Sequence, residues 1–393
     1  MPGFSLLALP LLLLAAWAAS LDRLAAQDRS GEILPAPERS AWPPADSIWV
    51  DAAGTPHVRR LPPPDDSALA DEQLLADPSQ LERANETPFA PAPVGVTSDL
   101  GGNSRRAPFT ARMFWIPQQD LSNQPGELAM NGEEIRLGFP LRIAPEGIWL
   151  GLASVRRLEI STAAVLPDSG LPVPKQLWDI EVGTMHLREL ANGWRAGGML
   201  RVGSPSDQPF GAVRDVAVTV LGFLTVPAGP RDAWSFSLFY SPTSQIVFPI
   251  PGLAYRWRPN AQFQADLGIP FALAYRPTET LELTAAYRPL IDVEVLLRQS
   301  LGAAWSVYGG YRTVNDTFLL ADRVNDRERT YLFDQRLLLG ITRELGGRWS
   351  LDLSAAYVFD RHLFQAEKFS GTRRDELEIA PGVAGTLTLQ WTR

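Results

Sequence analysis

Apolar and polar residues alternate along most of the chain after residue 109. Successive side chains of a β-strand point to opposite faces, so this pattern predicts strands with one apolar and one polar face. The longest run places apolar residues at the odd positions from Phe263 to Tyr275, with Gln264 and Asp266 between them. Further runs cover 135–143, 194–202, 216–226, 234–240, 281–287, 291–297, 349–359 and 377–391. No helical period competes over these windows.

Tryptophan and tyrosine stand at both ends of several apolar faces. Trp349 and Tyr357 bracket one such face, and the separation is even, so both rings lie on the same side. Six to eight strand residues at about 3.4 Å each, tilted as in a barrel, cover roughly 16–21 Å of membrane depth. Aromatic rings of this kind settle at membrane interfaces, whereas a soluble β-sandwich, the alternative fold, does not require them. The predicted aromatic girdle is Trp234, Tyr240, Tyr255, Tyr275, Tyr287, Trp305, Tyr311, Trp349, Tyr357 and Trp391.

These patterns predict an all-β fold, a transmembrane antiparallel β-barrel over 109–393 with about 12 strands, within a range of about 10–14. We place the first strand at 109–115, its successor at 135–143 and the closing strand at 376–391. Glycine pairs and Asn-Gly predict tight turns at 192–193 and 346–347. Longer polar connections lie at 204–211, 315–329 and 366–375. Proline within apolar runs, at Pro249, Pro251 and Pro270, predicts bulges or bends.

The N-terminal third differs in composition. An apolar run over 4–19, with small residues at Ala16-Trp17-Ala18 and Ala25-Ala26, predicts a signal peptide over 1–26, although no Lys or Arg precedes it. An uncleaved anchor is the alternative. Residues 27–108 are rich in proline, which favours a disordered periplasmic arm. Within it, 47–58 could form a small hairpin and 67–84 has helical composition. The arm is either a spacer or a docking segment for peptidoglycan or a periplasmic protein.

Composition excludes several classes of function. The net charge of −8 provides no basic stripe for nucleic acid. The absence of cysteine excludes disulfides, thiolate metal sites and a lipidated N-terminal cysteine, and the three histidines make a histidine-rich metal site unexpected.

The polar face of the predicted strands carries charges that we expect to face the barrel lumen. The candidates are Asp266, Glu282, Arg288, Asp292, Glu294, Arg298, Asp334, Arg336 and Asp352, and the same reading places Arg312, Glu376 and Glu378 there. Two interpretations stay open: a salt-bridged ladder that fills a narrow barrel, or a hydrated, mildly cation-preferring lumen.

A search for catalytic chemistry finds little. A hydrolase needs a nucleophile, a base and an orienting group, but His186 and His362 lie near strand ends and no Gly-x-Ser-x-Gly segment accompanies them. We expect no catalytic residue, no cofactor and no metal.

Two segments, FPIPGLAY at 248–255 and YVFDR at 357–361, resemble a bacterial family of exported proteins classed as a domain of unknown function. The resemblance covers roughly 130–393. It implies an outer-membrane barrel and supplies no substrate and no catalytic residue. The chain ends Trp391-Thr392-Arg393, without the terminal aromatic residue of common outer-membrane barrels.

The sequence therefore predicts an outer-membrane β-barrel that is a passive pore or a structural envelope protein. Its expected partners are outer-membrane lipid and the barrel-assembly machinery. The alternatives are a lipid-modifying enzyme of the outer membrane and a binding or adhesin barrel that uses the loop at 315–329.

Overall fold

The computed structural model describes residues 49–50, 56–57, 108–144, 147–244, 248–287, 292–346 and 348–392. The predicted signal peptide, the helical stretch at 67–84 and Arg288 lie outside these residues. No helix in the described part is long and apolar enough to cross a membrane. One short 3-10 turn, η1 (Val213–Asp215), is the helical segment of the described barrel region.

A small unit precedes the barrel. Strands β1 (Trp49–Val50) and β2 (Pro56–His57) pair antiparallel, with Trp49 opposite His57. This confirms the hairpin that the sequence predicted at 47–58.

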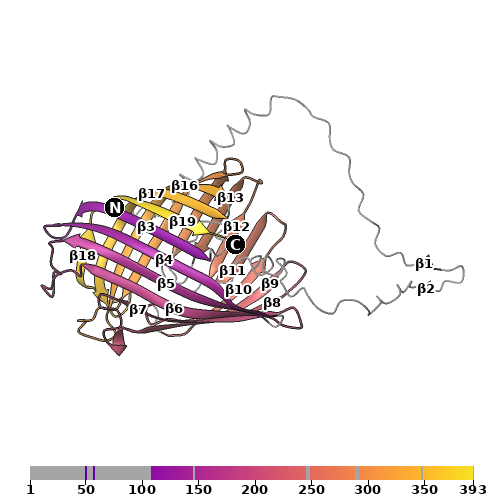
Figure 1. The fold of residues 1–393 in the computed structure, drawn as a ribbon, viewed down its shortest axis with the longest axis horizontal. Helices are drawn as coiled ribbons and strands as arrows, with labels where there is room; N and C mark the ends of the chain where they lie inside the picture. The colour runs from indigo at the N-terminus through magenta and orange to yellow at the C-terminus, as the bar shows by residue number, and fades with distance from the viewer. Residues whose placement is uncertain are drawn as a thin grey trace, which may run out of the picture. The chain divides into compact units, whose positions relative to one another are not determined.

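The rest of the described chain is a closed antiparallel barrel in which strands pair with their neighbours in sequence, except that β18 and β19 both pair with β17. Strand β19 pairs with β3 and closes it, and in Figure 1 the yellow last strands lie beside the indigo first one. The strands are β3 (Phe109–Asp120), β4 (Glu127–Ala144), β5 (Gly147–Thr162), β6 (Gln176–Glu189), β7 (Arg195–Ser206), β8 (Ala217–Pro227), β9 (Ala233–Tyr240), β10 (Ile250–Trp257), β11 (Phe263–Ile269), β12 (Phe271–Tyr275), β13 (Leu281–Tyr287), β14 (Val293–Ser300), β15 (Trp305–Phe318), β16 (Arg329–Gly346), β17 (Trp349–Ala366), β18 (Arg374–Ile379) and β19 (Gly382–Trp391).

These elements make 16 barrel strands, because β18 and β19 pair with successive parts of β17 and together form one strand. The prediction of a barrel is confirmed, but the prediction of about 12 strands is wrong. Part of the error lies in the run from Phe263 to Tyr275. It is two strands, β11 and β12, which turn back at Pro270 so that Phe263 lies opposite Tyr275.

The two ends of the barrel differ. At the end where β3 begins, the connections are short, for example 145–146, 190–194 and 347–348; we call it the short-turn end. At the opposite, long-loop end, the connections include 163–175, 207–216, 241–249, 319–328 and 367–373. Gly193, with φ of 77°, sits in one short turn as predicted. Long loops at one end and short turns at the other are typical of outer-membrane barrels.

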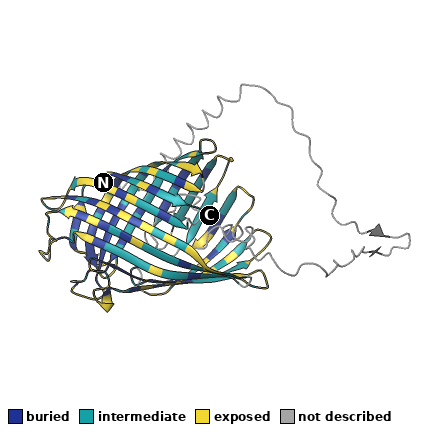
Figure 2. Cartoon of the chain, in the orientation of Figure 1, coloured by how far each residue is buried: buried dark blue, intermediate teal, exposed yellow. Residues whose placement is uncertain are grey.

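The two faces of the wall separate by polarity. Leu267, Leu353 and Tyr357 are exposed on the outer face, while Asp266 and Val358, each next to one of them in sequence, are buried on the inner face. Figure 2 shows this as a checkered pattern of buried and exposed positions along neighbouring strands. The outer face is apolar although it is exposed. Exposed apolar side chains are unfavourable in water but favourable in contact with lipid.

A line of irregularities crosses three neighbouring strands near the long-loop end. The register shifts after Ile116 on β3 and around Phe359 and Asp360 on β17, and the strand between them is interrupted at 380–381, between β18 and β19. An extra residue inverts the alternation beyond it. Leu377 and Ile379, predicted on the outer face together with Val383, are therefore buried inside, while Val383 stays 59% exposed. The predictions that Leu377 and Ile379 face outward, and that Glu376 and Glu378 face the lumen, were wrong for this reason.

Candidate functional site: the barrel interior

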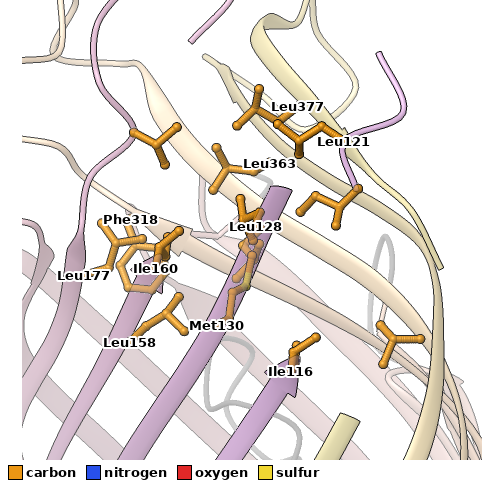
Figure 3. Close-up of a cluster of buried hydrophobic side chains, with 14 of the residues drawn as sticks. Ile116, Leu121, Leu128, Met130, Leu158, Ile160, Leu177, Phe318, Leu363 and Leu377 are labelled. Atoms are coloured by element: carbon orange, nitrogen blue, oxygen red, sulfur yellow. The ribbon is translucent and has the colours of Figure 1, made fainter. Parts of the chain in front are cut away.

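Apolar side chains narrow the interior at the long-loop end. Figure 3 draws 14 of them and labels ten, among them Phe318 from β15, Leu177 from β6 and Leu363 from β17. Strand β6 lies far from β15 and β17 around the sheet, yet the three side chains belong to one buried cluster. We call it the apolar cluster; its strand members are Phe114, Ile116, Leu128, Met130, Leu158, Ile160, Leu177, Phe318, Leu332, Val358, Leu363, Leu377, Ile379 and Ala384. Side chains from the surrounding walls thus meet at this level.

An ion pair spans the interior next to the apolar cluster. Arg156 on β5 donates to both carboxylate oxygens of Asp316 on β15, at 2.6 Å for Nη1 to Oδ1. The two strands are not neighbours in the sheet, so the contact bridges opposite walls. Both side chains are only 6% exposed. At the same end the backbone N–H of Leu319 donates to the carbonyl of Pro205, at 2.7 Å, which brings β15 to the end of β7. The interior is narrow here.

Four of the predicted lumen carboxylates form ion pairs with arginine. Glu294 pairs with Arg312 at 2.6 Å and Asp334 with Arg336 at 2.6 Å, each between a carboxylate and a guanidinium of the inner face. Asp266 with Arg256 at 2.8 Å and Glu282 with Arg276 at 2.7 Å complete the four. The described inner wall is therefore largely charge-balanced in pairs.

Asp352 has a different environment. It accepts hydrogen bonds from Tyr308 Oη at 2.8 Å and Thr342 Oγ1 at 2.7 Å. Arg298 is linked to Asp352 through the same threonine. Its Nη1 donates to Thr342 Oγ1 at 3.1 Å and to Ser306 Oγ at 2.9 Å. Asp292 lies half-buried before β14.

Sequence reasoning missed several inner charges. Asp316 was placed in the predicted polar connection at 315–329, and Arg156, Arg256 and Arg276 were not predicted to face the lumen. Asp316 lies four residues after Arg312 on the same strand, so continued alternation was the signal that could have placed it on the inner face.

The predicted girdle residues fall in two rows. Trp234, Tyr275, Trp305 and Trp349 are exposed at the short-turn end, and Trp349 lies opposite Trp391 in the β17–β19 register. The ring of Tyr255 lies 4.9 Å from that of Trp234. Residues Tyr240, Tyr287, Tyr311 and Tyr357 lie toward the long-loop end of their strands.

The connections at the long-loop end are tied together by buried arginines. Arg323 donates to Asp215 at 2.8 Å and to the carbonyl of Arg214 at 2.6 Å, so the loops 319–328 and 207–216 are joined. Arg323 and Asp215 are only 2% and 1% exposed. Arg329 likewise donates to the carbonyls of Pro242 and Glu367, at 2.7 and 2.8 Å. These loops pack against one another at the rim.

The two histidines of the barrel lie apart. His186 stacks on Trp149 near the short-turn end, with ring centroids 4.4 Å apart. His362 lies on β17 near the long-loop end, between Asp360 and Glu376. They cannot act in one catalytic group.

A family model matches residues 168–369, which is more than half of the chain. The chain belongs to the family described as a domain of unknown function, DUF6268. This confirms the resemblance to an uncharacterised family of barrel proteins. No curated protein matches the sequence.

Solved structures similar to this chain are outer-membrane barrels. The outer-membrane channel COG4313 from Pseudomonas putida F1 has a TM-score of 0.32 at 8% identity and covers 72% of this chain and 95% of that one. The TodX monoaromatic hydrocarbon channel has a TM-score of 0.31 at 9% identity, covering 72% and 89%. The β domain of the Bordetella autotransporter Brka has a TM-score of 0.28 at 13% identity, covering 72% and 98%.

Proposed function

We propose that this chain is an outer-membrane channel for small solutes, with its narrowest part at the long-loop end. The observation that carries the proposal is a closed barrel of 16 strands whose outer face is apolar and whose inner face carries paired charges. An apolar exterior suits lipid, and a charged inner wall suits a hydrated lumen.

The strand number supports a pore over a filled barrel. Barrels of about 8 strands are filled by their own side chains, whereas those of about 16–18 strands leave an aqueous channel. On the outer face, the apolar band between the aromatic row that contains Trp349 and the row that contains Tyr357 has a height that suits the hydrocarbon core of a bilayer. In this proposal the aromatic rows lie at the two lipid interfaces, and the predicted partners are outer-membrane lipid and the assembly machinery.

The test is single-channel recording of the refolded full chain in planar bilayers. A channel gives discrete conductance steps. Because four of the predicted lumen carboxylates are paired with arginine, we expect the permeability ratio of K⁺ to Cl⁻ to be close to unity. Absence of steps in the wild type and in the widened variant described next would contradict the channel proposal.

Replacing Phe318 with alanine is expected to increase the unit conductance. Phe318 fills the interior from β15 in the apolar cluster, so its removal widens the narrowest part. The control is Leu339→Ala, which removes an exposed side chain from the outer face of β16 and should leave conductance unchanged. Heat-modifiable gel migration shows that each variant is folded. Equal conductance of both variants would place the constriction elsewhere.

Deleting residues 27–105 is expected to leave the barrel folded. Strand β3 begins at Phe109 and already pairs with both β4 and β19, so the ladder needs no earlier strand. The measurement is heat-modifiable migration of the shortened chain. Loss of the folded band would show that the arm supplies part of the barrel. We propose that the arm serves as a spacer or a docking segment in the periplasm.

A further inference from the structure

A cluster of possible metal ligands lies on the outside of the wall near the long-loop end. His362 on β17 lies directly opposite Glu378 on β18, and Glu376 lies two residues away on the same face. The donor atoms of the three side chains all lie within 4.8 Å of one another. Tyr357 belongs to the aromatic row toward the long-loop end, and His362 follows it by five residues. The cluster therefore lies beyond the proposed membrane band.

The two ring nitrogens of His362 differ in a way that points to a ligand. Nε2 lies 3.0 Å from Oδ1 of Asp360 and is engaged by that carboxylate. Nδ1 lies 3.0 Å from Oε1 of Glu376, but it is buried and makes no hydrogen bond. A carboxylate on one nitrogen, with the other left for a metal, is the arrangement that orients histidine ligands of zinc.

The surroundings hold the cluster in place. Asn123 donates from its side chain to the carbonyl of Glu376 at 2.7 Å and accepts from the backbone N–H of Glu378 at 3.1 Å. The ring of Phe333 stacks against that of His362, with centroids 6.5 Å apart. The ring of His362 and the backbone of the two glutamates are therefore held by groups on other strands and loops.

One positive charge already lies at the cluster. Arg373 donates to Glu376, and its guanidinium also lies 4.4 Å from the centre of the Phe364 ring. An arginine with an aromatic ring as second partner can leave the carboxylate and keep a favourable cation–π contact. Glu376 is then released to a metal ion.

We propose that His362, Glu376 and Glu378 form a zinc site, with Asp360 as a positioning residue. One imidazole and two carboxylates leave a fourth position for water, as in tetrahedral zinc sites with three protein ligands. The nitrogen ligand favours zinc over calcium or magnesium, which prefer oxygen. The site joins β17 to β18 on the outside and does not depend on the barrel being a channel.

The test is metal content of the refolded, tag-free full chain after incubation with zinc alone and dialysis. We expect about one zinc per chain in the wild type, and loss of it in His362→Ala and in Glu376→Gln, which keeps the side-chain shape. The matched control is His186→Ala at the opposite end, which should retain the metal. The chain has no cysteine and three histidines, so background binding is low.

Asp360→Asn gives a second readout that a purely structural role would not produce. Asparagine tolerates the positive φ of 51° at this position, and we expect zinc affinity to fall roughly 10–100-fold while the folded band persists. The proposal is overturned if the wild type takes up no zinc, if His362→Ala and Glu376→Gln retain it, or if His186→Ala loses it.

Discussion

Replacing Asp316 with alanine is expected to destabilise the barrel by about 3–5 kcal/mol, the usual cost of leaving one partner of a buried ion pair alone. Asp316 accepts from Arg156 across the interior, and both side chains are almost fully buried. Without the carboxylate, the guanidinium stays buried beside the apolar cluster without its partner. The free energy of unfolding can be measured by urea titration with tryptophan fluorescence.

Two further variants make the measurement decisive. In Arg156→Met/Asp316→Leu both charges are replaced by apolar groups, and we expect most of the lost stability to return, because both members of the ion pair are removed together. In Asp326→Ala an exposed partner of Arg214 is removed, and the change should stay below about 1 kcal/mol. If Asp316→Ala behaved like Asp326→Ala, the pair of Arg156 and Asp316 would not be a buried ion pair.

Replacing Leu353 with arginine is expected to cost about 2–4 kcal/mol in lipid vesicles. Leu353 is 49% exposed on the outer face of β17, midway between Trp349 and Tyr357. If these two rings mark the interfaces, position 353 lies near the bilayer midplane. There an arginine side chain has no water or partner within reach.

The control for this prediction is the next residue. Ser354 lies on the inner face of β17 opposite Gly340, and Ser354→Arg places the same side chain toward the lumen. Its effect on unfolding should be small, while its effect on conductance should be visible. Equal destabilisation by both variants would contradict the assignment of the outer face to lipid.

The fold class was within reach of the sequence because alternation reports directly on strands. The strand number was not. The segment at 263–275 keeps its alternation while the chain reverses at Pro270, so two short strands have the pattern of one long strand. Strands β5 and β6 were not predicted, although they pair over most of their length. Glycines and charges on both faces weaken the contrast there, as at Gly151 and Arg157.

The interior was predicted in part. The inner carboxylates follow from the same alternation, but their partners depend on register, which a single sequence does not contain. The apolar cluster was missed for a further reason. Beyond the irregularities near Ile116, Asp360 and Pro381, the inward positions become apolar, so Leu377 resembles a lipid-facing residue until the pairing is known.

The strand that closes the barrel consists of two segments, and this bears on how the wall is assembled. Strand β19 pairs with β3 from Gly385 opposite Trp115 to Trp391 opposite Phe109. Closer to the long-loop end, few contacts join β18 to the end of β3 and the chain after it. They are one β-bridge, between Leu121 and Ile379, and two backbone hydrogen bonds. In these the N–H of Ala380 donates to Asp120 and the N–H of Ser122 donates to Glu378, both at 2.8 Å. The lower part of the seam, between β19 and β3, can therefore pair before the upper part, between β18 and the chain after β3. The amides of the upper part should also exchange with solvent faster than those below, since few bonds must open there. We therefore expect the upper part of the seam to close last during insertion and to open first in the finished barrel.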